Sequence, residues 1–373
     1  MEVKELVVDG TNVYCLCEVC AARQGDGIEH FDMVKARSCF ICGGLTSTTP
    51  LIGGRILRKA KRYQFKTFSI GMILPPGVQE REDRLRSDLK IRGGATIKSE
   101  LTGQIARLVG KSMHRTVDRL HPELTVLVNL SNGDLDLATK SVFVYGRYTK
   151  PRGVHQKKEL CDRCWGAGCD QCDLGYARTP SVEKALGTKL GKLLGSPRVK
   201  FTWLGSEDFE SIVLPPGRPF IAEVKSPMRH ALPTKLSLRT GAGLVKVARL
   251  KRLIARPISI PAFTFSTRAF VESGAQTTVD LSELNRIRNL SVRYKNNKGK
   301  VVFKTVHKVK VLKTGGSKLI VEIKLDGGLP VKRFVNGDSV SPSISEVLKA
   351  PMSCQRFDIL RVWESEGFEF GKV

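Results

Sequence analysis

The chain has 373 residues, of which 41% are hydrophobic and 26% are charged, a balance that excludes a disordered or fibrous protein. This length allows two or three domains of about 100–200 residues each. The net charge of +26 favours a polyanionic partner, with RNA or DNA as the leading expectation.

An anionic membrane surface is the alternative partner, but we find no basic amphipathic helix and no lipidation signal. No apolar run approaches the roughly 20 residues needed to cross a bilayer, and the N-terminal residues lack a signal sequence. We therefore expect a cytoplasmic protein with no membrane partner.

Eight of the ten cysteines form C-x-x-C pairs, and two of these pairs lie near the N-terminus. They are Cys17 with Cys20 and Cys39 with Cys42. Two such turns complete the closed tetrahedral shell that structural zinc prefers. A reducing cytosol disfavours the alternative of disulfides, and a redox dithiol would not need two pairs in one place. We predict a structural zinc site here and treat Cys15 as an ordinary cysteine.

Three secondary-structure elements are predicted after this module. Residues 97–109 place apolar side chains at helical spacing and predict an amphipathic helix. Residues 124–128 and 141–145 are rich in β-branched and aromatic residues, and Asn132-Gly133 between them has turn chemistry. We expect these two strands to pair or to neighbour each other in one sheet.

The other two C-x-x-C pairs are close together in the middle of the chain. They are Cys161 with Cys164 and Cys169 with Cys172, and the glycines between them permit a tight reversal. We predict a second Cys₄ zinc site, again structural because no open ligand position is evident. Cys354, the remaining unpaired cysteine, is treated as ordinary.

The C-terminal half is rich in predicted strands, including residues 218–224, 318–323 and 357–363, which indicates a mixed α+β domain. From Asn285 to Lys318, with both ends included, there are eleven Lys or Arg residues and no Asp or Glu, with aromatic residues interspersed. Such a stretch can follow a phosphate backbone. A solvated strand face is the alternative, and we favour RNA contact.

Five separated segments resemble the archaeal and eukaryotic tRNA pseudouridine synthases called the Pus-ten family, over nearly the whole chain. The segments are the first cysteine module with residues 97–100, then residues 145–150, the second cysteine cluster with residues 179–183, residues 205–208 with 217–220, and residues 328–338. Residues 145–150 look like the end of the family's RNA-binding THUMP domain.

The resemblance implies a set of active-site residues. Asp208 takes the place of the catalytic aspartate, as nucleophile or base, and Lys332 is the cation that favours its ionised form. Tyr294 matches a tyrosine that stacks on the target base, although a sheet-surface tyrosine is the alternative. We add Arg218 and Arg293 as substrate-binding residues.

The resemblance also implies the substrate and the organisation of the chain. The substrate is tRNA, at uracil-54 and/or uracil-55 of the TΨC arm, and the isomerisation needs no organic cofactor. We predict an α+β multidomain protein with a zinc-binding module at 1–50, a THUMP-like domain at 51–152 and a pseudouridine synthase catalytic domain at 153–373. A monomer is the expected state.

The sequence departs from the family pattern at several positions. Members usually have Arg in place of Ser206 and of Ile212, and Thr-Tyr in place of Leu329-Pro330. An arginine-rich loop is replaced by the hydrophobic residues 256–263. The alternative function is therefore a catalytically lapsed, zinc-containing tRNA-binding protein. A THUMP-bearing methyltransferase or thiolation enzyme would need a glycine-rich nucleotide loop, which the sequence lacks.

Overall fold

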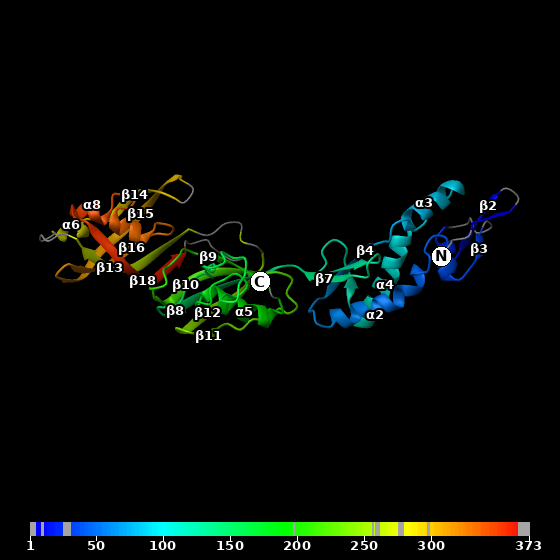
Figure 1. Cartoon of the computed structure of the whole chain (residues 1–373), viewed down its shortest axis with the longest axis horizontal. Helices are drawn as coiled ribbons and strands as arrows, with labels where there is room; N and C mark the ends of the chain where they lie inside the picture. Colours follow the sequence, from blue (N-terminus) through cyan, green and yellow to red (C-terminus); the bar gives the residue numbers. More distant parts are fainter. Residues whose placement is uncertain are drawn as a thin grey trace. The chain divides into compact units, whose positions relative to one another are not determined.

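In the computed structural model of the chain, the described residues are 5–8, 11–24, 31–196, 198–255, 257, 262–274, 280–296 and 299–364. The chain divides into two compact units (Figure 1). The N-terminal unit comprises Met1–Lys140 with Ser226–Arg229, and the C-terminal unit comprises Ser141–Lys225 with His230–Val373. The predicted α+β multidomain fold class is confirmed, whereas the predicted domain boundaries at 50 and 152 remain predictions.

The described residues of the N-terminal unit form two small sheets and four α-helices. The first sheet has the strand order β1-β2-β3, and the second has the order β5-β4-β6-β7. The strands are β1 (Glu5–Val8), β2 (Thr11–Leu16), β3 (Phe31–Met33), β4 (Thr67–Ile73), β5 (Thr116–Val117), β6 (Leu124–Asn129) and β7 (Leu135–Thr139). The helices are α1 (Glu18–Ala22), α2 (Thr49–Ala60), α3 (Val78–Asp88) and α4 (Ile97–Met113), with short 3₁₀ turns at Ala36–Ser38 and Leu45–Thr48.

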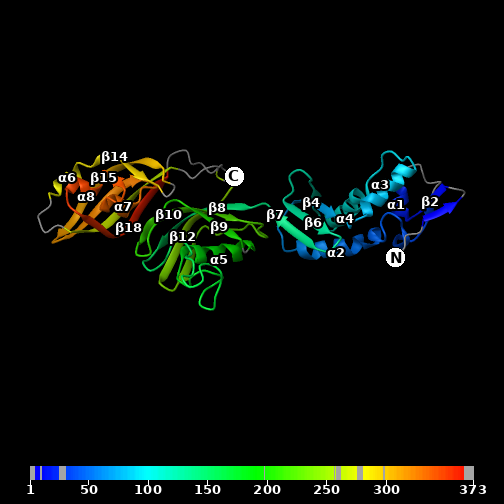
Figure 2. The same ribbon diagram turned by 45° about the horizontal axis from the view of Figure 1, so that its top comes forward.

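Helix α4 confirms the helix predicted at 97–109. It begins at Thr96, whose side chain accepts a hydrogen bond from the backbone N–H of Ser99. Its residues at spacing four, Ile97, Leu101 and Ile105, are buried. This face packs in the core of the N-terminal unit, and α4 lies beside α2 (Figure 2).

The predicted pairing of residues 124–128 with 141–145 is wrong. Strand β6 pairs instead with β7, which the Asn132-Gly133 turn connects to it. We did not predict β7 because it has only two leucines, Leu135 and Leu137, within a polar segment. Residues 142–145 belong instead to strand β8, which is part of the sheet of the C-terminal unit.

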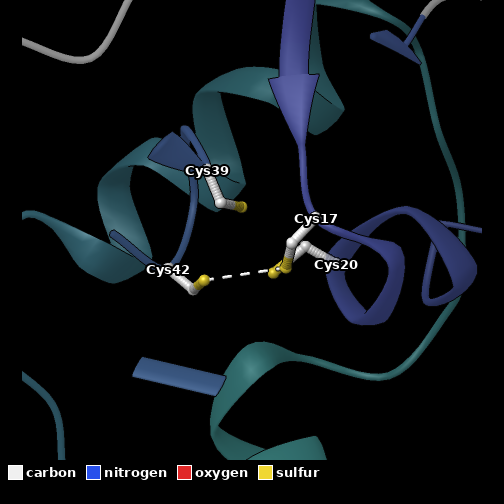
Figure 3. A group of neighbouring side chains, drawn as sticks. All are labelled: Cys17, Cys20, Cys39 and Cys42. Atoms are coloured by element: carbon white, nitrogen blue, oxygen red, sulfur yellow. Dashed lines mark hydrogen bonds between the residues drawn. The ribbon is translucent and has the colours of Figure 1, made fainter. Parts of the chain in front are cut away.

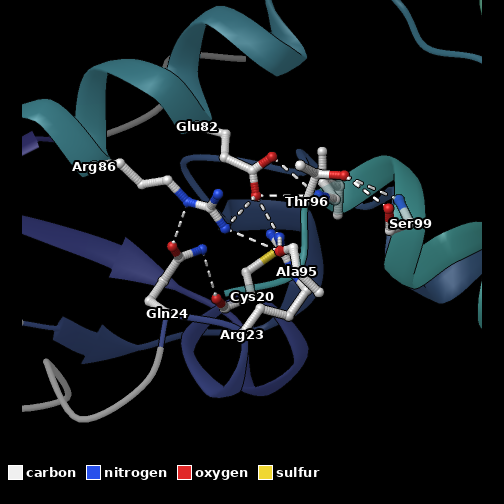
Figure 4. Close-up of polar contacts among 9 residues, drawn as sticks. Cys20, Arg23, Gln24, Glu82, Arg86, Ala95, Thr96 and Ser99 are labelled. Carbon is white, nitrogen blue, oxygen red and sulfur yellow. Dashed lines mark hydrogen bonds and ion pairs between the residues drawn. The ribbon is translucent and has the colours of Figure 1, made fainter. Parts of the chain in front are cut away.

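A buried polar network ties the first cysteine module to the helices of the N-terminal unit (Figure 4). Glu82 of α3 accepts hydrogen bonds from the backbone N–H of Ile97 at 2.9 and 3.1 Å, and it forms an ion pair with Arg23. Arg86 donates to Gln24, which in turn donates to the carbonyl of Cys20. The start of α4 and the turn that carries Cys20 are therefore held by the same carboxylate.

The C-terminal unit is built on one long sheet. The strand order is β11-β12-β8-β10-β18-β13-β16-β15-β14-β17, and β9 also pairs with β10. The strands are β8 (Val142–Lys150), β9 (Val199–Trp203), β10 (Val213–Val224), β11 (Leu236–Thr240), β12 (Gly243–Leu253), β13 (Phe263–Ser273), β14 (Arg288–Lys295), β15 (Val301–Gly315), β16 (Lys318–Asp326), β17 (Val340–Ser341) and β18 (Met352–Glu364). The helices are α5 (Val182–Leu194), α6 (Ser282–Asn285), α7 (Val331–Asn336) and α8 (Ile344–Leu348).

The three strands predicted in this half are confirmed, within β10, β16 and β18. The basic stretch forms the antiparallel pair β14 and β15. On β15 the apolar side chains Val306 and Val309 are buried, whereas Lys308 and Lys310 are exposed. The charges therefore lie on the solvent face, where RNA contact remains a proposal. Within the described residues, no helix is long and apolar enough to cross a membrane.

Candidate active site and cysteine clusters

Asp208 lies in the connection between β9 and β10, a loop shaped by Gly205. Gly205 has a φ of +85°, and a Cβ there would lie 2.1 Å from a nitrogen of Arg218. Any other residue would be strained and would displace Arg218. The loop therefore requires glycine three residues before Asp208.

A buried polar network between β8, β10 and the loop itself stabilises this loop. Arg218 of β10 is 1% exposed, and its Nε lies 2.8 Å from Oε2 of Glu207. Glu207 also accepts hydrogen bonds from the hydroxyl of Tyr148 and from Gln156. Burial raises the pKa of Tyr148 well above its usual value, which keeps this hydroxyl a donor. Arg218 also donates to the carbonyl of Leu204 at 2.8 Å.

Lys150, at the end of β8, holds the backbone of the same loop. Its side chain is buried, and Nζ donates to the carbonyls of Asp208 at 3.0 Å and Ser211 at 2.7 Å. It also donates to the carbonyls of Val154 at 2.7 Å and Phe209 at 3.5 Å. Burial lowers the pKa of Lys150 to about 8. Lys150 is a positioning residue, since it fixes the carbonyl of Asp208 and not its carboxylate.

Strand β18 anchors the far end of the loop. Asp358 accepts a hydrogen bond from the backbone N–H of Ile212 at 3.0 Å, and Arg152 lies 3.2 Å from the same carboxylate. The backbone N–H of Ile359 donates to the carbonyl of Ile212 at 2.8 Å. Ile212 thus contributes to the loop through its backbone N–H and carbonyl.

The Asp208 carboxylate forms an ion pair with a lysine of helix α7. Nζ of Lys332, the second residue of α7, lies 2.6 Å from Oδ2 of Asp208, and the two side chains are 43% and 40% exposed. The pair borders a cavity of about 180 Å³. The cavity is lined by Gly205, Ser206, Asp208, Arg218, Phe265, Gly328, Leu329, Pro330, Val331, Lys332 and Phe357.

The structure therefore brings Asp208, Lys332 and Arg218 to one cavity, but it places the other two predicted residues outside the cavity lining. Tyr294 of β14 is 8% exposed, and its hydroxyl donates to the carbonyl of Gly328 at 2.7 Å. Burial raises the pKa of Tyr294. Arg293 is the adjacent residue on the strand and is exposed on the opposite face.

A second cavity, of about 590 Å³, adjoins the first through Gly205 and Gly328. Its walls include the aromatic side chains of Trp203, Phe263 and Trp363. Aromatic faces of this kind can stack on an unpaired base. The cavity of Asp208 therefore has a neighbour with aromatic walls.

Sequence reasoning missed the residues that support the loop. Glu207, Tyr148, Gln156 and Lys150 are all buried. Three of them lie in segments that carry the family resemblance, but no role was assigned to any of the four. The one available signal was Lys150, which follows a run of residues typical of a buried strand. A buried ammonium group needs hydrogen-bond acceptors around it.

The first cysteine group lies in the core of the N-terminal unit (Figure 3). Cys17, Cys20, Cys39 and Cys42 are at most 4% exposed, and their four sulfurs lie within 4.8 Å of one another. The sulfurs of Cys17 and Cys42 are 3.8 Å apart. Arg23 donates to the sulfur of Cys20 at 3.5 Å, which stabilises negative charge on a thiolate.

The second group is built from tight turns on the surface of the C-terminal unit. Sulfur distances are 3.8 Å for Cys161 to Cys169 and 3.8 Å for Cys164 to Cys172. Backbone N–H groups of Cys169 and Gly175 donate to the sulfur of Cys172 at 3.1 and 3.3 Å. This segment therefore presents four preorganised sulfur ligands.

Both groups fit a tetrahedral metal ion. A zinc–sulfur bond of about 2.3 Å places the sulfurs of a tetrahedral site about 3.8 Å apart. That is the separation found in both groups. Among the described residues, neither group includes Cys15 or Cys354. Burial raises the pKa of the Cys354 thiol to about 12.

Two family models match the chain. Residues 52–129 match the model described as "Pus10 THUMP domain, archaeal", and residues 143–253 match the one described as "Pus10, C-terminal". Residues 145–150, which we expected at the end of the THUMP domain, fall within the second match and form part of β8. These residues pair with β10 and β12, and the expected domain boundary at 152 stays a prediction.

Named relatives cover most of the chain. The "tRNA pseudouridine synthase Pus10" of Nitrosopumilus maritimus is 33% identical over 87% of this chain and 85% of its own length. The protein of that name from Cenarchaeum symbiosum is 29% identical, over 95% and 91%. A structure titled "Crystal Structure of a Cbf5-Nop10-Gar1 Complex" matches 59% of this chain and 48% of its own with a TM-score of 0.31 at 8% identity, too weak a likeness to support a conclusion.

Proposed function

Because the chain belongs to the Pus10 family of tRNA pseudouridine synthases, we propose that it isomerises uracil-54, uracil-55 or both in the TΨC arm of tRNA, with Asp208 as nucleophile or base. The observation that carries the proposal is the carboxylate of Asp208 in the lining of a cavity, 2.6 Å from the ammonium of Lys332. Both side chains remain accessible to a ligand.

The reaction needs one well-placed carboxylate. The bond between C1′ of the ribose and N1 of uracil breaks, the base turns, and a bond forms between C1′ and C5. The proton on C5 is lost and N1 gains one, so no redox cofactor takes part. Asp208 acts at the sugar or the ring as a carboxylate, with the ammonium of Lys332 as its neighbour.

The other predicted residues have distinct proposed roles. Two buried nitrogens of Arg218, Nε and Nη2, have no hydrogen-bond partner among the described residues, and of the two only Nε is ion-paired, with Glu207. Because Arg218 lines the cavity, Nη2 can donate to a uracil carbonyl. Tyr294 would stack on the base, which requires its buried ring to become uncovered. Arg293 is exposed and suits a backbone phosphate.

The second candidate function is a tRNA-binding protein that has lost activity. The observation in its favour is that three of the departures from the family pattern, Ser206, Leu329 and Pro330, line the cavity beside Asp208. The absence of an arginine and of a Thr-Tyr pair there removes polar groups that could hold an extruded base. Retention of Asp208 with a close cation favours the enzyme.

We propose that both Cys₄ groups hold structural zinc, because four sulfurs with no open position match that ion's preference. Zinc bound there would stabilise the fold and take no part in the isomerisation. We also propose that the protein acts as a monomer in the cytoplasm.

Position mapping tests the reaction. The purified protein is incubated with an unmodified tRNA transcript and with transcripts in which uracil-54 or uracil-55 is replaced by cytosine, and pseudouridine is mapped by chemical labelling. Product at either position, abolished when that uracil is replaced, supports the proposal. Tight tRNA binding with no product on any transcript would support the lapsed enzyme instead.

A further inference from the structure

A basic groove lies between helix α5 and strand β11 in the C-terminal unit. It encloses about 590 Å³, and its lining contains five Lys or Arg residues and no Asp or Glu. The basic residues are Arg178, Lys184, Lys189, Lys192 and Arg239. None of them lines the cavity of Asp208. The groove is therefore a separate concentration of positive charge.

The fold creates this groove by burying only one side of α5. Val182, Leu186 and Leu190 face the hydrophobic core. Lys184 and Lys192, two helical turns apart, lie on another face and line both this groove and an adjacent cavity of about 460 Å³. The other wall is β11, which stands at one end of the strand order of the sheet.

The second cysteine group orients one end of the groove. Arg178 donates to the carbonyl of Asp170 at 2.7 Å, and Lys184 lies 2.7 Å from a carboxylate oxygen of Asp173. Lys189 and Arg239 are exposed and make no ion pair with any described residue. Their charges are thus available to an anionic ligand.

We propose that this groove is a second RNA-binding surface, which holds the sugar–phosphate backbone of the substrate tRNA away from the catalytic cavity. The proposal rests on the proposed function for the identity of the RNA. Cations from three chain segments, spread along an open groove, suit a polymer of phosphates. No aromatic side chain lines the groove, so it binds backbone and not bases.

The test compares two charge-reversed proteins. Lys189→Glu with Arg239→Glu alters the groove, and Arg252→Glu with Lys349→Glu changes the net charge by the same amount at exposed positions that line none of the four cavities described above and belong to neither cysteine group. The dissociation constant for unmodified tRNA transcript is measured against salt concentration, together with kcat and KM for pseudouridine formation.

For the groove variant we expect tRNA binding about tenfold weaker than for the control, with kcat unchanged. The logarithm of its affinity should also fall less steeply with the logarithm of salt concentration, by about 0.9 for each phosphate that the variant no longer neutralises.

Binding and salt dependence equal to the control would overturn the groove proposal, even if the parent makes pseudouridine, and would leave an acidic protein as the alternative partner of the groove. Weaker binding by the groove variant with no product from the parent would support the groove and overturn the proposed function. The two proposals can therefore fail separately.

Discussion

The two Cys₄ groups have the same ligands and similar sulfur distances, yet they are embedded differently. The first is at most 4% exposed and packs within the core of the N-terminal unit. Beside the second, Trp165 is 79% and Leu174 is 91% exposed. A C-x-x-C motif therefore predicts the ligands but not how much of the fold depends on them. The burial around the motif decides that.

The largest expected effect is the loss of one cysteine ligand from each Cys₄ group. Cys20→Ser should remove one metal ion per chain and unfold the N-terminal unit, since structural zinc contributes about 10–16 kcal/mol in small domains. Cys164→Ser should also remove one ion but leave both units folded, because the residues around the second group are largely exposed. Metal content and thermal unfolding of each unit are the readouts. Equal destabilisation of the N-terminal unit by both variants would contradict this account.

The ion pairs beside each group extend the comparison. Arg23→Met leaves Glu82 buried without its closest cation and should cost about 3–5 kcal/mol in the free energy of unfolding. Arg163→Met removes a pair with Asp170 in which the side chains are 60% and 77% exposed, and should cost less than about 1 kcal/mol. Denaturant titration measures both. Similar destabilisation by the two variants would show that burial does not set the difference.

The active site shows the same contrast, since the side chain of Lys150 is buried and that of Lys332 is partly exposed. Burial lowers the pKa of Lys150 from 10.5 to about 8. Between these pH values the unfolded chain holds a proton that the folded chain has released, so the contribution of Lys150 to the free energy of unfolding rises with pH. Below pH 8 it is protonated in both states and contributes no pH dependence.

The corresponding variant is Lys150→Met, which has no group to titrate there. The difference in unfolding free energy between parent and variant should therefore shift in favour of the parent as pH rises from 8 to 10.5. Unfolding is followed in denaturant at several pH values. A difference that stays flat across this range would show that Lys150 is not buried as a charge.

The sequence predicted what depends on local pattern. The helix at α4 followed from apolar spacing, and the strands within β16 and β18 followed from runs of β-branched residues. Both Cys₄ groups followed from ligand spacing alone. The strand β7 was missed because its short pattern is weak, and β8 was assigned to the wrong sheet because pairing partners far along the chain leave no local signal.

The candidate site was predictable only in part. Asp208 and Lys332 came from resemblance, and the structure places them 2.6 Å apart although 124 positions separate them in the sequence numbering. The buried supports of the loop, Glu207 and Lys150, could not be predicted, since their role depends on hydrogen bonds that form only when β8, β10 and the loop assemble. Tyr294 also came from the resemblance, and in the structure its ring is buried while its hydroxyl bonds to Gly328, which lines the cavity.

The most direct test of the central claim is the single-turnover rate of pseudouridine formation by Asp208→Asn, measured beside its affinity for the same tRNA transcript. Asparagine keeps the size of the side chain but cannot act as a carboxylate. The account predicts no detectable product with a dissociation constant within about twofold of the parent, since the phosphate backbone supplies most of the affinity. Product formed within about tenfold of the parent rate would contradict the assignment of Asp208 as the reactive group.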